Sequence, residues 1–271
     1  MTDDRGAPDD LNAATIEAVV KGRLGRPLRY LDETPSTNSE ALGWAQAGAP
    51  EGALVVAGHQ TTGRGRWGRE WFSPAGTALT FSLVLRPPLD PSSAGLLTAA
   101  VGVACAVGIR SSSALRPRLK WPNDVMLDGR KVAGILLESR VEAGRIRAVV
   151  AGVGVNVKTL TNAPTDVAER ATTIADHVER PPSRALLLAD ILAGLEDLYR
   201  DAATAGFARR VIEEATGLSE VLGRGVMVRL AGGGSLEGRA ERLTSRGELE
   251  VRTEDALVTV HSGEIERLRT S

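Results

Sequence analysis

The first two thirds of the chain alternate between short apolar runs of strand length and longer apolar stretches. Three short runs are rich in β-branched residues and bounded by glycine or proline, which is typical of buried strands; they span 54–57, 78–85 and 149–155. Two longer stretches, 96–109 and 186–199, are long enough for helices that pack on such a sheet. The pattern predicts an α/β fold.

A hairpin is predicted in the middle of this region. Asp128 and Gly129 separate the apolar run 125–127 from the run 131–137, and Asp-Gly between two apolar runs is a strong local signal for a tight turn. Lys131 is therefore expected to begin the return strand of the hairpin.

After Gly223 the pattern changes to short alternating runs separated by glycine-rich or charged turns. These runs span 226–230, 236–243, 249–251 and 257–260. Such a succession is typical of a small antiparallel barrel. The predicted organisation is an N-terminal tail with one weak helical pattern, a main domain and a small all-β C-terminal domain, over residues 1–27, 28–218 and 219–271.

Composition narrows the class of protein. The 271 residues carry a formal net charge of −1, so no global electrostatic attraction to nucleic acid is expected. The single cysteine, Cys105, excludes disulfides and cysteine-based zinc sites, and a buried thiol is predicted. The longest apolar stretch, 94–109, is shorter than the roughly 20 residues of a membrane span. The acidic N-terminus lacks the features of a secretory signal, so a cytoplasmic protein is expected.

The segment 60–71 is the most informative part of the sequence. Its glycines formally match the G-x-G-x-x-G pattern of dinucleotide sites, but that pattern must open a helix, whereas Pro74 and Gly76 follow here and lead into a strand. What remains is a glycine loop with three arginines, whose guanidinium groups and backbone amides suit phosphate and carboxylate oxygens. The residues concerned are Gly63, Arg64, Gly65, Arg66, Gly68 and Arg69.

Two simpler interpretations of this loop are a solvated basic turn and an arginine-glycine patch that binds RNA. Both are disfavoured because the motif occurs once, is flanked by Trp67 and Trp71, and is not extended into a repeat. An anion-binding loop is the preferred interpretation.

Four shorter motifs are weak when each is taken alone. Lys120-Trp-Pro-Asn-Asp124 ends a predicted strand at a proline turn. Gly134 follows Lys131 closely, and a glycine inside a strand lets a ligand approach the backbone. Gly152-Val-Gly-Val-Asn156 contains glycines of a kind that often serve only close packing. Ser36-Thr-Asn38 precedes a helical run, for which a helix N-cap is the simpler interpretation.

Taken in their order along the chain, these motifs resemble the catalytic domain of biotin protein ligases, over residues 28–160. The C-terminal segment resembles the small SH3-like domain of the same family. The resemblance implies a mixed sheet with packed helices in the catalytic domain. It also implies an enzyme that uses ATP and Mg²⁺ to activate biotin as biotinyl-5′-AMP, and then transfers biotin to a lysine of a biotin carboxyl carrier protein.

The resemblance also implies roles for individual residues. Those expected to bind biotin or the adenylate are Ser36, Thr37, Asn38, Gln60, Gly63, Arg64, Gly65, Arg66, Trp71, Lys131, Gly134, Gly152 and Asn156. Those expected to act in catalysis are Lys131, Arg64, Arg66, Arg69 and Asp124. Lys131 would hold the biotin carboxylate and the α-phosphate together, and Arg69 would serve the triphosphate. For Asp124 three roles stay open, namely orienting Lys131, a metal or the incoming amine.

Two alternatives are considered, one within the enzyme class and one from a different class of protein. A lipoate protein ligase shares the fold and the adenylate chemistry, but the arginine-glycine loop and the motif 120–124 favour biotin. A non-enzymatic binding protein is disfavoured by the ordered set of motifs. Many family members bind DNA through an N-terminal winged helix-turn-helix, and the residues before 28 are too few for one, so no DNA binding is expected. The sequence chooses neither between monomer and homodimer nor among carrier proteins.

Overall fold

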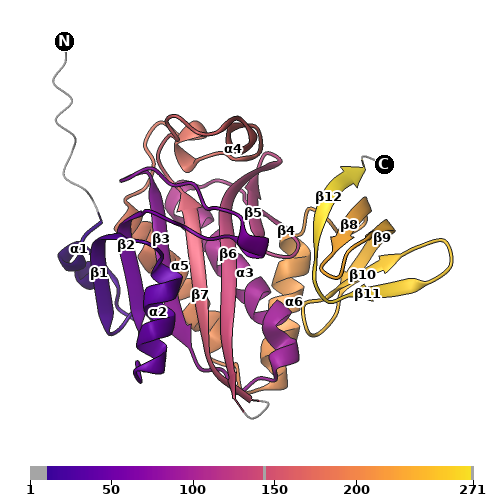
Figure 1. The fold of residues 1–271 in the computed structure, drawn as a ribbon, viewed down its shortest axis with the longest axis horizontal. Helices are drawn as coiled ribbons and strands as arrows, with labels where there is room; N and C mark the ends of the chain where they lie inside the picture. The colour runs from indigo at the N-terminus through magenta and orange to yellow at the C-terminus, as the bar shows by residue number, and fades with distance from the viewer. Residues whose placement is uncertain (1–10, 143–144, 270–271) are drawn as a thin grey trace.

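The computed structural model describes residues 11–142 and 145–269, which form a larger sheet covered by helices and a smaller all-β unit beside it (Figure 1). The helices are α1 (Ala13–Val19), α2 (Thr37–Gln46), α3 (Ala94–Ser113), α4 (Thr165–Arg170), α5 (Arg184–Tyr199) and α6 (Ala205–Leu218). The strands of the larger sheet are β1 (Leu28–Thr34), β2 (Leu54–Gln60), β3 (Ala78–Leu85), β4 (Arg118–Lys120), β5 (Asp124–Leu127), β6 (Arg130–Glu142) and β7 (Arg145–Asn156). Those of the smaller sheet are β8 (Gly225–Leu230), β9 (Ser235–Leu243), β10 (Leu249–Arg252), β11 (Leu257–Val260) and β12 (Gly263–Arg269).

The larger sheet has the strand order β1-β2-β3-β7-β6-β5-β4. β1 and β2 run parallel, and the other neighbouring strands run antiparallel. Helices α3 and α5 pack on one face of the sheet, and α2 lies on the other face (Figure 1). The predicted mixed sheet with packed helices is therefore confirmed.

The central strands are apolar throughout because both of their faces are buried. Successive side chains of a strand point to opposite faces of the sheet. Leu54 and Val56 join the core under α3 and α5, whereas Val55 packs with Ala41 under α2. The buried strands and long helices predicted from the apolar pattern are all present, as β2, β3, β7, α3 and α5.

Helix α3 is the central helix of the main core. By length and composition alone it could cross a membrane. Most of its residues are instead buried in the protein, where it packs against α5, α6 and the sheet, as the sequence predicts. Cys105 is one of these buried residues, and burial raises the pKa of its thiol to about 12.

The prediction that residues 1–27 form a tail is wrong for residues 11–27, while residues 1–10 lie outside the described part. Leu11, Ile16, Val20 and Leu24 are each at most 4% exposed and belong to the main core. Ile16 lies within α1, which packs mainly on α5, and Leu11, Val20 and Leu24 lie in the segments on either side of that helix. Burial of an aliphatic side chain contributes about 1.5–3 kcal/mol, so four together are enough to hold so short a helix in place.

The predicted hairpin is confirmed at β5 and β6. Asp128 and Gly129 have positive φ angles of 47° and 75°, the backbone conformation that a tight two-residue turn requires. Leu127 pairs with Arg130, so Lys131 lies at the start of the return strand.

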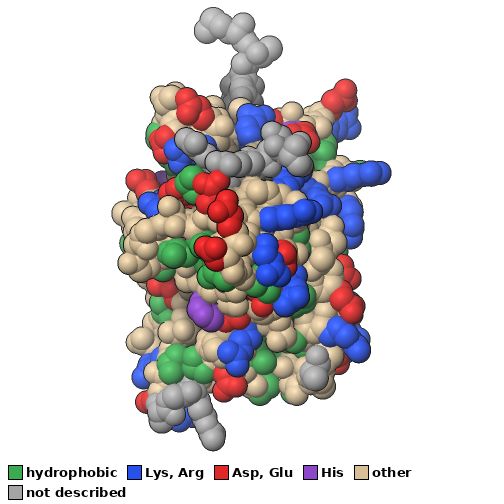
Figure 2. All heavy atoms as spheres, turned by 90° about the vertical axis from the view of Figure 1, so that its right-hand side faces the viewer, with side chains coloured by type: hydrophobic (Ala, Val, Ile, Leu, Met, Phe, Trp, Pro, Cys, Tyr) green, Lys and Arg blue, Asp and Glu red, His purple; other side chains and the backbone are tan. Residues whose placement is uncertain are grey.

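The smaller sheet has the order β11-β10-β9-β8-β12 and a hydrophobic cluster of its own. Four of its strands were predicted, and β12 was missed because its two apolar residues, Ile265 and Leu268, are separated by the charged pair Glu266 and Arg267, which breaks the alternation. Figure 2 shows basic side chains gathered toward the upper right of this side of the molecule, with acidic side chains beside and below them. Arg242 pairs with Glu250 and Arg252 with Glu241.

Backbone contacts join the two sheets closely. The indole Nε1–H of Trp121 donates to the carbonyl oxygen of Gly247 at 3.0 Å. A Cβ atom added at Gly247 would come within 2.6 Å of the Gly95 carbonyl oxygen at the start of α3. Leu119 of β4 forms a parallel bridge with Ser219. The smaller sheet is thereby fixed beside the motif 120–124.

Candidate active site

A polar pocket lies where the first turn of α2, the end of β2 and the arginine-glycine loop meet the middle of β6 and β7. The residues that line it are Ser36, Thr37, Asn38, Gln60, Arg64, Gly65, Arg66, Trp71, Asn123, Lys131, Gly134, Ile135, Leu136, Gly152, Val153 and Gly154. Segments far apart in the sequence thus form one site.

Glycines form the floor of this pocket. Gly134 of β6 and Gly154 of β7 are register partners, and the Trp71 ring lies over both of them. A Cβ atom at Gly154 would overlap that ring, and one at Gly152 would overlap the Asn38 amide. Gly134 was predicted to let a ligand approach the backbone. In the structure, side chains of the protein itself, Trp71 and Lys131, lie against this glycine.

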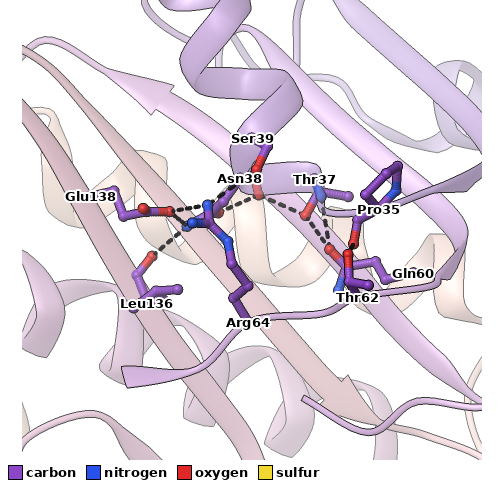
Figure 3. A network of polar contacts seen from close by, with 10 residues as sticks. Pro35, Thr37, Asn38, Ser39, Gln60, Thr62, Arg64, Leu136 and Glu138 are labelled. Carbon is purple, nitrogen blue, oxygen red and sulfur yellow. Dashed lines mark hydrogen bonds and ion pairs between the residues drawn. The ribbon is translucent and has the colours of Figure 1, made fainter. Parts of the chain in front are cut away.

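Polar groups at the start of α2 are fixed by neighbouring strands (Figure 3). The backbone N–H and the hydroxyl of Thr37 donate to Gln60 Oε1 at 2.8 and 3.0 Å. This leaves the amide nitrogen of Gln60 as a donor. Ser36 is the N-cap residue, yet its side chain makes no capping hydrogen bond. Ser36 therefore occupies the N-cap position as predicted, but its hydroxyl does not cap the helix.

Asn38 has every polar atom engaged. Its Nδ2 donates to the carbonyl oxygen of Leu136 at 3.2 Å and to Glu138 Oε2 at 2.7 Å, and its Oδ1 accepts from the Ser82 hydroxyl at 2.6 Å (Figure 3 shows the first two). Glu138 also accepts from Arg64 Nη2 at 3.0 Å. Ser82 and Glu138 were missed by the sequence analysis; the signal for Ser82 is a hydroxyl inside a buried and mostly apolar strand, which Thr80 also has.

The arginine-glycine loop doubles back on itself. The Trp71 N–H donates to the Gly63 carbonyl oxygen at 2.9 Å, and the Gly65 N–H donates to that of Arg69 at 2.7 Å. A Cβ atom at Gly63 would come within 2.7 Å of the Trp71 carbonyl oxygen, so the first glycine permits the return of the chain. At the tip, Trp67 has a left-handed backbone with φ of 58°.

Two arginines of this loop reach the smaller sheet. Arg66 donates to the Gly263 carbonyl oxygen at 3.0 Å and to Ser262 Oγ at 3.1 Å. Arg69 donates through both terminal nitrogens to the Glu264 carboxylate, at 2.5 and 2.7 Å. Arg229 donates to the same carboxylate at 2.7 Å. We call these five residues, Arg66, Arg69, Arg229, Ser262 and Glu264, the interdomain clasp.

The electrostatics of the interdomain clasp favour the ionised groups in two of its members. Burial alone would raise the pKa of Glu264, but hydrogen bonds from Arg69 and Arg229 bring it below its ordinary value. The hydrogen bond to Glu264 raises the pKa of Arg69. Burial lowers the pKa of Arg66, whose partners are mostly neutral oxygens.

Lys131 lies between the polar pocket and a second cavity. Its Nζ is 2.6 Å from Asp124 Oδ1 and 5.6 Å from the centre of the Trp71 ring. The second cavity carries charges of both signs and is lined by Arg69, Lys120, Asp124, Met126, Gly129, Lys131, Glu169, Arg170, Arg229, Glu264, Ile265 and Glu266. A ligand that extends from one cavity into the other must pass the Lys131 ammonium group.

Two buried polar atoms near Lys131 have no hydrogen-bond partner among the described residues. Asn156 donates through Nδ2 to the carbonyl oxygens of Thr172 and Lys131, at 3.0 and 3.5 Å, which leaves its Oδ1 as an unused acceptor. The indole Nε1 of Trp71 is an unused donor. An unpaired buried polar group costs about 1–3 kcal/mol, so two of them mark a place prepared for a polar ligand.

The structure gathers most of the residues that the sequence analysis selected. Eleven of them line the polar pocket, from Ser36 to Gly152, and Arg69 and Asp124 join Lys131 on the second cavity. Gly63 and Asn156 are absent from both linings and support their neighbours instead. Within residues 11–142 and 145–269, no group of three or more His, Cys, Asp or Glu residues could hold a metal ion by itself.

Comparisons with known proteins agree with this geometry. Models of the biotin/lipoate A/B protein ligase family and of the biotin protein ligase C-terminal domain match residues 30–156 and 221–268. The bifunctional ligase/repressor BirA of Bacillus subtilis is 34% identical over 262 residues, covering 96% of this chain and 80% of that protein. The biotin--[acetyl-CoA-carboxylase] ligase of Mycobacterium tuberculosis is 33% identical over 276 residues, covering 99% and 100%. Biotin protein ligase from Aquifex aeolicus in complex with biotin and ATP superposes with a TM-score of 0.75 at 26% identity, covering 91% of this chain and 100% of that one.

These matches define the class of the protein as the biotin and lipoate ligases, which removes the non-enzymatic alternative. Within that class the chain belongs to the biotin protein ligase family, and it is a ligase.

Proposed function

We propose that this ligase forms biotinyl-5′-AMP from biotin and ATP and then transfers biotin to a lysine of a biotin carboxyl carrier protein. The observation that carries the proposal is the place of Lys131 between a polar pocket and a second cavity that offers cations. The related enzyme from Aquifex aeolicus is described in complex with biotin and ATP, which supports the choice of substrates.

The polar pocket suits the ureido ring of biotin. That ring presents two N–H donors and one carbonyl acceptor, so a binding site needs fixed partners of both kinds. Thr37 and Gln60 supply them, and their orientation is set by the hydrogen bonds between them. Because each unpaired buried polar group would cost about 1–3 kcal/mol, such a site selects the ureido ring over the apolar dithiolane ring of lipoate.

Adenylate formation requires a carboxylate to attack a phosphate, although the two repel each other. A lysine ammonium has three donors, so Lys131 can keep its contact with Asp124 and still donate to the biotin carboxylate and to the α-phosphate. We propose that Asp124 orients Lys131, since the 2.6 Å ion pair fixes the direction of the side chain. Arg69 and Lys120 supply further positive charge for the departing pyrophosphate.

The adenine base is assigned to the unused polar atoms of Asn156 and Trp71. The exocyclic amine of adenine can donate to Asn156 Oδ1, which is buried and has no other partner among the described residues. Such a contact would remove the cost of leaving that oxygen unpaired.

Mg²⁺ fits this site as a companion of ATP. When phosphates and waters supply most of its ligands, Mg²⁺ needs only one or two protein carboxylates. Asp124 is a carboxylate on the second cavity that meets this need, whereas both oxygens of Glu264 are taken by arginines. Bound there, the ion would neutralise charge on the triphosphate.

Transfer of biotin requires the acceptor lysine as a neutral amine, although its reference pKa of about 10.4 keeps it protonated at pH 7. Exclusion of water by the arginine-glycine loop favours the neutral amine and protects the adenylate from hydrolysis. We propose that the acceptor is the biotin carboxyl carrier protein, that the chain acts without binding DNA, and that it works in the cytoplasm.

The proposed function is tested by ATP–pyrophosphate exchange with the purified protein. Exchange that depends on biotin, but not on lipoate, is the expected result, together with incorporation of biotin into a carrier domain and none into the same domain with its acceptor lysine replaced by arginine. Exchange driven equally well by lipoate would overturn the choice of substrate.

A further inference from the structure

The segment that follows β7 carries α4 and returns over the β5–β6 hairpin, where Thr172 and His177 are anchored (Figure 1). We propose that His177 is a positioning residue for adenine recognition, acting through Thr172 on Asn156. This inference rests on the proposed function, because it concerns how the protein recognises the adenine base of ATP.

Thr172 is the hub of the arrangement and is 1% exposed. Its N–H donates to the Lys131 carbonyl oxygen at 2.9 Å, and its own carbonyl oxygen accepts from Asn156 Nδ2 at 3.0 Å. Its hydroxyl lies 3.1 Å from Asp176 Oδ2 and 2.9 Å from His177 Nε2. The hub therefore links the lysine strand, Asn156 and His177 through every polar atom that Thr172 has.

A count of protons gives each bond its direction. The Thr172 hydroxyl has one hydrogen, and the Asp176 carboxylate can only accept, so the hydroxyl donates to Asp176. The Thr172 oxygen can then accept a hydrogen bond from His177 in the tautomer that carries its hydrogen on Nε2, and we assign that tautomer here. On the other side of the ring, His177 Nδ1 lies 3.3 Å from Asp128 Oδ2 in the hairpin turn. The imidazole thus lies between the turn before Lys131 and the hub.

This connection decides where the Asn156 acceptor points. Asn156 is 3% exposed, and its amide is held by two carbonyl oxygens, those of Thr172 and Lys131. Without the donor from His177, the Thr172 hydroxyl loses a partner in a buried place, and the Thr172 backbone can shift. The Asn156 amide would follow its carbonyl partner, and Oδ1 would no longer face the adenine amine.

The test compares His177→Ala with the wild type in biotin-dependent pyrophosphate exchange, using ATP and ITP as nucleotides. ITP carries a carbonyl oxygen where ATP carries the exocyclic amine, so it reports contact with Asn156 Oδ1. Loss of one well-placed hydrogen bond predicts an increase in KM for ATP of about tenfold and a similar fall in the preference for ATP over ITP, with KM for biotin unchanged. The matched control is His261→Ala, which removes another histidine paired with a carboxylate, 75% exposed on the smaller sheet.

Two further variants separate positioning from a general loss of structure. His177→Gln keeps an N–H donor at about the place of Nε2, so it should restore most of the ATP preference. In an Asn156→Ala background, His177→Ala should leave the nucleotide preference unchanged, because the group through which it acts is gone.

The outcomes distinguish failure of the proposed function from failure of the role assigned to His177. If the wild type shows no biotin-dependent exchange with ATP, the proposed function itself fails. If the wild type is active and folded His177→Ala keeps the full preference for ATP over ITP, only the role of His177 is overturned. If His177→Ala does not fold, His177→Gln decides: an ATP preference about tenfold below wild type in that folded variant would contradict the assigned donor.

Discussion

Removal of the Glu264 carboxylate from the interdomain clasp should open the arginine-glycine loop and release the adenylate. Glu264 receives two hydrogen bonds from Arg69 and one from Arg229, at 2.5 to 2.7 Å. Isolated exposed ion pairs contribute about 0.2–1 kcal/mol, whereas hydrogen bonds to charged groups contribute about 1.5–3 kcal/mol when shielded. The side chains of Arg69 and Glu264 are 52% and 29% exposed, so their coupling should lie between these limits, at about 1–2 kcal/mol.

That energy corresponds to a shift of about 5- to 30-fold in the balance between closed and open loop. The assay is the dissociation rate of preformed biotinyl-5′-AMP from wild type, Arg69→Ala, Glu264→Ala and the double variant. Pyrophosphate has already left at this stage, so the rate reports the clasp and not a contact of Arg69 with the triphosphate. Glu241→Ala, which breaks the pair with Arg252 on the same sheet, is the control and should leave the rate unchanged.

Once either Arg69→Ala or Glu264→Ala has been made, the second substitution should increase the dissociation rate of the adenylate only slightly. Fully additive effects of Arg69→Ala and Glu264→Ala would refute the coupling.

The clasp also has a defined pH dependence. Because the pKa of Glu264 in the folded protein lies below its ordinary value of 4.5, its contribution is complete above pH 4.5 and is lost as the pH falls through the lower value. Adenylate release from the wild type should accelerate in that acid range, and release from Glu264→Ala should show no such step.

Three further predictions concern the proposed mechanism. Lys131→Ala should slow adenylate formation by about 100-fold or more while the unfolding midpoint stays within a few degrees of wild type, and a normal single-turnover rate would show the role to be misassigned. Arg66→Gly removes the contacts to Ser262 and Gly263, so it should still make the adenylate but release it and label nearby lysines unselectively; retention as long as in the wild type would contradict this. No biotin-dependent, sequence-specific shift of DNA from a biotin-synthesis promoter is expected at physiological salt, because the 271 residues carry a formal net charge of −1 and phosphate contacts supply most non-specific affinity for DNA.

Local patterns predicted much of the larger sheet. The Asp128-Gly129 turn and the strands beside it depend on residues adjacent in sequence, and the structure has them where the pattern predicted. The segment 11–27 shows the limit of this reasoning. Its apolar residues are too few to form a stable helix alone, and they are buried only when the segment packs against α5, β1 and the main core.

The sequence predicted the residues that line the pocket, but not the residues that hold them in place. The residues 36–38, Gln60 and the arginine-glycine loop were found from their motifs, since their residue types state the chemistry. Ser82 and Glu138, which hold Asn38, carry no such signal, because a serine or a glutamate in a strand is common everywhere. Their functional roles, like those of the motif residues, stay predictions until the variants are measured.

The sequence by itself determined most of the strands, the helices α3 and α5, the hairpin before Lys131 and the set of polar residue types that a biotin ligase needs. These depend on neighbours a few positions apart, whose steric and hydrophobic preferences act in any fold. Only the tertiary structure decided that Arg66 meets Ser262, 196 positions away, and that Asn156 is left with one unused acceptor beside Lys131. Such contacts depend on how the two sheets pack, which is fixed by the burial of many side chains together and not by any local pattern.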